Sequence, residues 1–166
     1  MKVRVIACGN PLMGNDAAGP EVLALLRMEH PEIDAVDGGT GGLGLIPLME
    51  GCDRVVIVDA TSGLGKPGEI HVFRDIPAGG IPSLSIHELG IPETLALARE
   101  LGLAPEVIVV GIEGGPMPGF SGDMDPPVRA AIKVGEALPW PRKRTSISIA
   151  EREHSGKAAW TRRTSE

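Results

Sequence analysis

The sequence predicts a three-layered α/β fold, in which a five-stranded, mostly parallel sheet lies between helices on both faces. Runs rich in Val and Ile alternate along the chain with segments of helical periodicity, the pattern of strand–helix–strand units. Residues 55–58 and 107–110 are apolar throughout, which is typical of parallel strands buried on both faces. The many glycines (23) and prolines (15) fall between these runs, so they mark turns within one folded domain.

The first half of the chain supplies three of the strands and two of the helices. Residues 3–8 predict the first strand, and a helix with one apolar face follows, beginning at residue 17 or 20 and ending at 29. The alternation over residues 33–37 predicts the second strand, and residues 43–50 predict a short helix. We expect the third strand at residues 54–59, with Asp59 as its last residue.

The second half supplies two strands and two helices. Residues 68–74 predict the fourth strand, and no helix fits between it and the third, so it should pair antiparallel or lie at an edge. A helix over residues 94–101, with a start near Pro92, precedes the fifth strand at residues 107–112. The last helix is predicted at about residues 126–138.

Charge and composition narrow the classes of protein. The predicted domain covers residues 1–140, and residues 141–166 form a basic tail that we expect to be disordered. The acidic body argues against a nucleic-acid partner, and no apolar run approaches the ~20 residues of a membrane span. The N-terminus lacks a signal-peptide pattern, and Cys8 and Cys52 lie in or beside apolar runs, so we expect a cytoplasmic protein. We also expect it to be a monomer.

A candidate site begins in the glycine-framed loop at residues 9–19, which carries Asp16 and follows the first strand. Open α/β sheets bind ligands at the carboxyl ends of their strands, so Asp16 and Asp59 converge if their strands are neighbours. His87 precedes the helix that leads into the fifth strand. Two carboxylates and an imidazole are a plausible ligand set for nickel or zinc.

Each of these residues also has a simpler structural explanation. Asp16 is placed to cap a helix, and Asp59 is placed to begin a turn. His87 lies within Ser85–Glu88, which fits a capping box.

Two other kinds of protein fit parts of the sequence. Gly39–Gly44 matches G-x-G-x-x-G, and Asp59 lies 20 residues beyond Gly39, so an NAD-type dinucleotide-binding protein is the alternative, although Pro47 interrupts the following helix. A cysteine protease would use Cys8 and His87, but Cys8 fits better as a small buried residue.

Five segments together resemble the hydrogenase maturation endopeptidases. They are GNPLMGNDAAG (9–19), DGGTGG (37–42), VIVDAT (56–61), SIHELGIPETLALARELG (85–102) and VVGIEG (109–114), in the order of that family. Members of the family remove the C-terminal extension of the [NiFe]-hydrogenase large-subunit precursor after nickel insertion. The resemblance implies that activity and partner here, and a twisted five-stranded mixed sheet with one antiparallel edge strand.

The resemblance also assigns roles to residues. The family's metal-binding positions fall on Asp16, Asp59 and His87, which implies that these three recognise the precursor's nickel and support hydrolysis by an aspartic-type endopeptidase. The loops implied to lie near the substrate contain Gly9, Asn10, Gly39, Thr40 and Gly41. The family often has two acids in tandem in the first loop, whereas this chain has Asn15 before Asp16. A non-enzymatic nickel-binding accessory protein would use the same three metal-binding residues.

Overall fold

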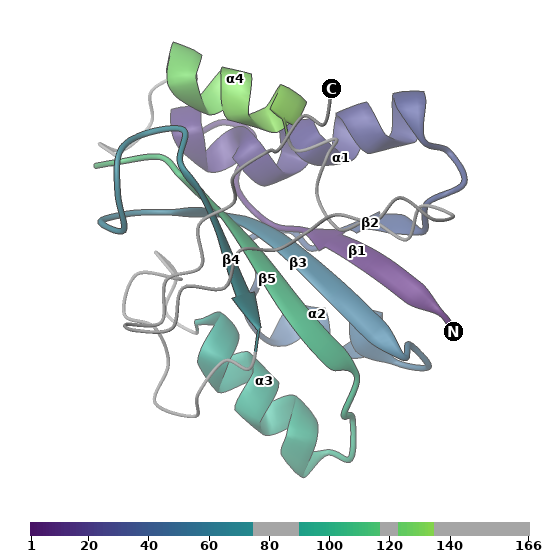
Figure 1. Ribbon diagram of the computed structural model, residues 1–166. Helices are drawn as coiled ribbons and strands as arrows, with labels where there is room; N and C mark the ends of the chain where they lie inside the picture. Colours follow the sequence, from purple (N-terminus) through teal and green to yellow (C-terminus); the bar gives the residue numbers. More distant parts are fainter. Residues whose placement is uncertain (75–89, 117–122, 135–166) are drawn as a thin grey trace, which may run out of the picture.

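The computed structural model describes residues 1–74, 90–116 and 123–134, which form one sheet between two layers of helices (Figure 1). The strand order is β2-β1-β3-β5-β4. The strands are β1 (Val3–Ala7), β2 (Ala35–Asp37), β3 (Arg54–Thr61), β4 (Ile70–Arg74) and β5 (Glu106–Glu113). All neighbours pair in parallel except β4, which pairs antiparallel with β5 at the edge. The predicted fold class and the edge position of the fourth strand are confirmed.

The two faces of the sheet carry separate apolar layers. On one face lie α1 (Ala18–Glu29) and α4 (Pro126–Val134), and on the other lie α2 (Leu45–Met49) and α3 (Ile91–Glu100), as Figure 1 shows. Side chains of β3 alternate between the layers, with Val56 and Val58 facing α1 and α4, and Val55 and Ile57 facing α2 and α3. Because each such side chain contributes about 1.5–3 kcal/mol when fully buried, β3 and β5 dominate the core.

Several boundaries differ by one or two residues from those predicted. β3 runs two residues past Asp59 to Thr61, because Ala60 and Thr61 pair in register with Ile112 and Glu113 of β5. Asp59 is therefore within the strand, and the prediction that it is the last strand residue is wrong. β2 begins at Ala35 rather than at residue 33.

The other predicted elements are present, some with bounds shifted by one or two residues, or lie outside the described residues. A 3-10 turn, η1 (Gly14–Ala17), precedes α1, and α3 begins beside Pro92 as expected. The capping box at residues 85–88, with His87, the end of the last helix beyond residue 134, and the tail at 141–166 all lie outside the described residues. In the described ranges, no helix has the length and apolar character that crossing a bilayer requires.

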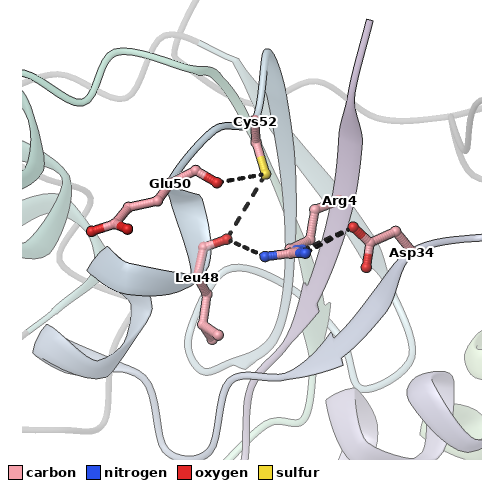
Figure 2. A network of polar contacts seen from close by, with 5 residues as sticks. All are labelled: Arg4, Asp34, Leu48, Glu50 and Cys52. Carbon is pink, nitrogen blue, oxygen red and sulfur yellow. Dashed lines mark hydrogen bonds and ion pairs between the residues drawn. The ribbon is translucent and has the colours of Figure 1, made fainter.

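An arginine network stabilises the end of the sheet at which β1 and β3 begin (Figure 2). The Arg4 guanidinium contacts Asp34 Oδ2 through Nε and Nη2, both at 3.0 Å, and its Nη1 donates to the carbonyl of Leu48 at 3.1 Å. Figure 2 also shows Cys52, whose thiol lies 3.9 Å from that carbonyl and 3.7 Å from the carbonyl of Glu50. The network joins β1, the residue before β2 and the end of α2, so this end is held by structural contacts.

Candidate active site

The opposite end of the sheet collects carboxylates from all four parallel strands. Asp37 ends β2, Asp59 lies in β3, Glu113 ends β5, and Asp16 lies in η1 after β1. Ala7 of β1 pairs with Asp37 of β2 on one side and with Val58 of β3 on the other, so Asp37, Asp16 and Asp59 lie in or follow three adjacent strands. The structure therefore brings Asp16 and Asp59 to one edge, as the sequence predicted.

Asp16 is buried, with 1% of its surface exposed. Its Oδ2 accepts the backbone N–H of Asn10 at 2.8 Å, whereas its Oδ1 is buried and has no hydrogen-bond partner among the described residues. The explanation of Asp16 as a helix cap is wrong: Ala17 is the N-cap of α1, and no side chain caps that helix. A buried carboxylate oxygen without a donor is costly, so this atom is available to accept a hydrogen bond or to contact a cation.

The loop that carries Asp16 is folded tightly because two glycines permit close backbone contacts. Gly9 has a φ of +132°, and a Cβ on it would lie 2.1 Å from the carbonyl oxygen of Asp16. A Cβ on Gly19 would lie 1.8 Å from the carbonyl oxygen of Cys8, so the first turn of α1 packs directly on the end of β1. Side chains at these positions would push Asp16 away from the edge of the sheet.

Asp59 is an acid with a strongly perturbed proton affinity. Burial and, to a smaller extent, the negative charge of Asp16 raise its pKa to about 7, although the 2.8 Å hydrogen bond from the Ala60 N–H to Oδ1 acts in the opposite direction. Only 5% of the residue is exposed. At neutral pH the carboxyl of Asp59 therefore readily gives or takes a proton.

Cys8 lies under these acids and is not a nucleophile. The residue is fully buried, and burial raises the pKa of its thiol above the ordinary range, as do the negative charges of Asp59, Asp37 and Asp16. The thiol is therefore protonated at neutral pH, when only the thiolate attacks substrates. Cys8 fits the sequence-based interpretation as a small buried residue, and the cysteine-protease alternative loses its nucleophile.

A pocket of about 410 Å³ opens beside Asp16. Four of the five residues expected near the substrate line it, namely Gly9, Asn10, Gly39 and Thr40; Pro11, Pro20, Leu23, Ala24, Arg27 and Asp37 complete the lining. The two loops are joined by a 2.8 Å hydrogen bond from the Gly9 N–H to the Gly39 carbonyl. Gly41, Asp16 and Asp59 do not line the pocket, but Asn10 does, and its backbone N–H contacts Asp16.

The glycine motif at residues 39–44 does not lead into a dinucleotide-binding helix. It enters a 3-10 turn, η2 (Gly42–Gly44), and then α2, which has only five residues. The dinucleotide fingerprint requires a longer helix whose aligned peptide dipoles face the pyrophosphate. The local structure thus argues against the NAD-binding alternative.

Two residues of this edge were not predicted from the sequence. Glu113 is fully buried, and its carboxylate accepts hydrogen bonds from Thr61 Oγ1 at 3.1 Å and from the backbone N–H groups of Gly63, Leu64 and Gly115 at 2.9, 3.0 and 2.9 Å. It thereby fixes the loop that follows β3. The signal in the sequence was an acid at the end of an otherwise apolar strand.

Asn15 is the second such residue. Its Nδ2 donates to the Gly114 carbonyl at 2.7 Å and to Asp125 Oδ2 at 2.9 Å, and its Oδ1 accepts the backbone N–H of Asp125 at 2.7 Å. This side chain joins η1 to the end of β5 and to the residue before α4. A carboxylate at this position, as in the two tandem acids that the family often has, would not make the two contacts of Nδ2, because it has no N–H to donate.

The predicted metal-binding set is described only in part. His87 lies outside the described residues. Within residues 1–74, 90–116 and 123–134, no three His, Cys, Asp or Glu side chains are grouped so that they could hold a metal ion. Asp16 and Asp59 supply carboxylate oxygens at one edge, and Oδ1 of Asp16, which has no hydrogen-bond partner among the residues described, fits a cation. The role of His87 remains a prediction.

Comparison with known proteins identifies the family. The family model of the hydrogenase maturation protease HycI matches residues 21–138. The hydrogenase expression/formation protein HupM of Azotobacter chroococcum is 30% identical over 143 residues, covering 82% of this chain and 68% of that protein. The hydrogenase 2 maturation protease of Escherichia coli is 31% identical over 119 residues, covering 68% of this chain and 73% of that protein.

Solved structures agree with this assignment. The maturating endopeptidase HybD of Escherichia coli superposes with a TM-score of 0.68 at 28% identity, covering 83% of this chain and 92% of that one. The [NiFe] hydrogenase maturation protease HybD of Thermococcus kodakarensis gives a TM-score of 0.64 at 28% identity, covering 83% and 99%. The chain matches the family model over more than half of its length and shares the fold of these solved structures, and it belongs to the hydrogenase maturation protease family.

Proposed function

We propose that this chain is an endopeptidase that removes the C-terminal extension of a [NiFe]-hydrogenase large-subunit precursor after nickel has been inserted. Membership of the hydrogenase maturation protease family supports the reaction and the class of substrate. The observation that carries the proposal is the buried pair Asp16 and Asp59, with one oxygen of Asp16 left without a hydrogen-bond partner in the described part of the chain.

In this proposal the nickel belongs to the precursor and is recognised at the acidic edge. Asp16 Oδ1 provides one ligand, Asp59 a second, and His87 a third, so that only a nickel-loaded precursor is held correctly for cleavage. The pocket beside Asn10 receives the chain next to the scissile bond, because its lining loops are the ones that flank Asp16. Recognition of the metal then makes cleavage conditional on its insertion.

Asp59 is the group suited to move a proton during hydrolysis. In the metal-free protein this acid has a pKa of about 7 and is partly ionised at neutral pH. With one oxygen on the nickel of the precursor the carboxylate is ionised, and its other oxygen can accept a proton from an attacking water and return it to the leaving amine. Asp16 helps to raise that pKa, as one carboxylate does for its partner in aspartic-type proteases. This pairing supports the aspartic type, with Asp59 as the base.

The test is incubation of the protein with a nickel-loaded precursor and with the nickel-free precursor, followed by mass measurement. Shortening of the loaded form alone is the expected result. Asp16→Asn, Asp59→Asn and His87→Ala should each reduce the rate at least about a hundredfold, since each removes a group in contact with the reacting centre. Asp53→Asn serves as the control, because Asp53 is an exposed acid at the other end of the sheet.

Other outcomes separate the alternatives. Binding of the loaded precursor without shortening would indicate a non-enzymatic nickel-binding accessory protein. Full activity of both Asp16→Asn and His87→Ala would refute the assigned roles while leaving the protease activity intact. Shortening of the nickel-free precursor at the same rate would refute recognition of the metal.

A further inference from the structure

We infer that Asn15 is a positioning residue that fixes the carboxylate of Asp16 by clamping η1 to both Gly114 and Asp125. The inference rests on the proposed function, because it assigns Asn15 to the same site. Three hydrogen bonds of 2.7 to 2.9 Å meet on this one side chain. They connect residues that are 99 and 110 positions apart in the sequence.

The clamp lies directly beside the residue it positions. Asn15 and Asp16 are neighbours in a four-residue 3-10 turn, so a change in the path of that turn moves both side chains. Asp16 itself is held by one hydrogen bond from the Asn10 N–H, because its Oδ1 has no partner among the described residues. A single side-chain hydrogen bond leaves the carboxylate free to rotate unless the backbone of the turn is held from elsewhere.

The clamp holds the backbone of η1 against the ends of two other elements. Gly114 follows the last residue of β5, and its own N–H donates to the Thr61 carbonyl at the end of β3. Asp125 immediately precedes α4, and its carbonyl accepts the N–H of Arg129 within that helix. Asn15 therefore fixes the position of Asp16 relative to β3, β5 and α4.

The amide group is essential to this arrangement. Nδ2 must donate to a carbonyl and to a carboxylate, while Oδ1 must accept an N–H, and an amide offers both functions. An aspartate at position 15 would place its carboxylate against that of Asp125 and against the Gly114 carbonyl. Three acceptors without a donor repel one another, so the turn would move away.

The same geometry predicts a rescue. In the double variant Asn15→Asp with Asp125→Asn, the amide at 125 donates to the new carboxylate at 15, and the backbone N–H at 125 is still accepted. Only the bond to the Gly114 carbonyl is lost. Asp125→Asn alone keeps the contacts, because its amide oxygen still accepts from Asn15 Nδ2. Positions 15 and 125 should therefore keep the clamp when they hold Asn and Asp, Asn and Asn, or Asp and Asn, respectively, but not when both hold Asp.

The experiment measures kcat and KM for cleavage of the nickel-loaded precursor, well below the melting temperature of every variant. Asn15→Asp should lower kcat about ten- to a hundredfold with KM within about twofold, because an ångström of misplacement costs about this much. The double variant should recover most of the loss. The matched control is Arg54→Ala. It breaks a 2.6 Å ion pair to Glu106, which joins β3 to β5 at the opposite end of the sheet.

A second readout does not need cleavage. The backbone amide of Asn10 contacts the carboxylate of Asp16 and reports its place in two-dimensional NMR spectra. Asn15→Asp should shift this amide, the double variant should return it, and Arg54→Ala should leave it unchanged. If Asn15→Asp does not fold, Asp125→Ala, which removes one of the three bonds, should give a smaller shift and a smaller loss of kcat.

The outcomes separate this inference from the proposed function. If the unaltered protein leaves the precursor intact, the proposed function fails, and the Asn10 amide alone decides whether Asn15 fixes Asp16. If Asn15→Asp resembles Arg54→Ala in kcat and in the Asn10 amide, the inference is overturned while the proposed function stands. A loss of kcat with an unmoved Asn10 amide also overturns it, because the effect then arises elsewhere.

Discussion

Replacing Asp59 by asparagine should make the protein more stable at high pH. The pKa of Asp59 is raised from 3.8 to about 7, chiefly by burial and then by the charge of Asp16. The unfolded chain solvates this carboxyl, so its pKa returns to the ordinary value on unfolding. Folding at pH 8 therefore buries an ionised carboxylate that the Ala60 N–H compensates only in part, and an amide of similar shape avoids this cost.

The sign and size follow from proton binding in the two states. Below pH 3.8 the carboxyl of Asp59 is protonated in the folded and in the unfolded protein, so it does not lower the free energy of unfolding. Between pH 3.8 and 7 the folded protein holds a proton that the unfolded chain has released, so stability falls as pH rises. Above pH 7 the penalty is complete at about 4 kcal/mol, because each tenfold change in proton affinity corresponds to about 1.4 kcal/mol.

Urea unfolding of both proteins at half-unit steps from pH 4 to pH 8.5 measures this penalty. The free energy of unfolding of Asp59→Asn minus that of the unaltered protein should rise by about 4 kcal/mol across the series and level off above pH 7. Asp16→Asn should reduce the penalty, because it removes the second cause of the shift. A difference that stays constant with pH, or that falls as pH rises, would refute the assignment of a raised pKa to Asp59.

Three further changes test the packing. Glu113→Gln should lower the free energy of unfolding by about 2–3 kcal/mol, because either orientation of the amide turns N–H groups toward a backbone N–H. The control is Glu106→Gln at a half-exposed acid, which should lower it by about 1 kcal/mol or less. Equal losses of the two variants in urea titrations would contradict this expectation. Gly19→Ala should lower the melting temperature by at least about 10 °C, because the new Cβ would collide with the Cys8 carbonyl. Gly44 has a φ of −61° and no atom within 4 Å of the position of a Cβ, so Gly44→Ala should change the melting temperature by only about 5 °C or less. Similar shifts in the two variants would argue against the close approach of α1 to β1. Arg4→Ala should cost about 1–2 kcal/mol in urea unfolding while leaving cleavage unchanged, and a loss of activity would show that the end of the sheet in Figure 2 is not purely structural.

The sequence predicted the sheet well because its central strands are defined by local pattern. The apolar runs in β3 and β5 identify strands that are buried on both faces, and the short connection before β4 leaves no room for a parallel crossover. The end of β3 was missed because Ala60 and Thr61 become strand residues only by pairing with β5, a contact that no local pattern contains.

The sequence predicted the two acids of the candidate site but not the residues that support the surrounding backbone. Asp16 and Asp59 follow from their places near the ends of neighbouring strands, although the 3-10 turn moves the helix start and removes Asp16 from its capping role. Glu113 and Asn15 act through partners 49 to 110 residues away in the chain. Neither spacing nor residue type indicates such partners before the sheet is assembled.

The sheet order also imposes a sequence of events during synthesis. β1, β2 and β3 leave the ribosome first and can pair with one another, but the other edge of β3 is completed by β5, whose Glu106 lies 52 residues beyond Arg54. β4 emerges in between and pairs only with β5. At translation rates of about 5–20 residues per second, the valine-rich edge of β3 is open for about 3–10 seconds. An open edge of this kind is a template for intermolecular pairing, so variants that delay the docking of β5 would be expected to lower soluble yield before they lower the stability of the finished fold.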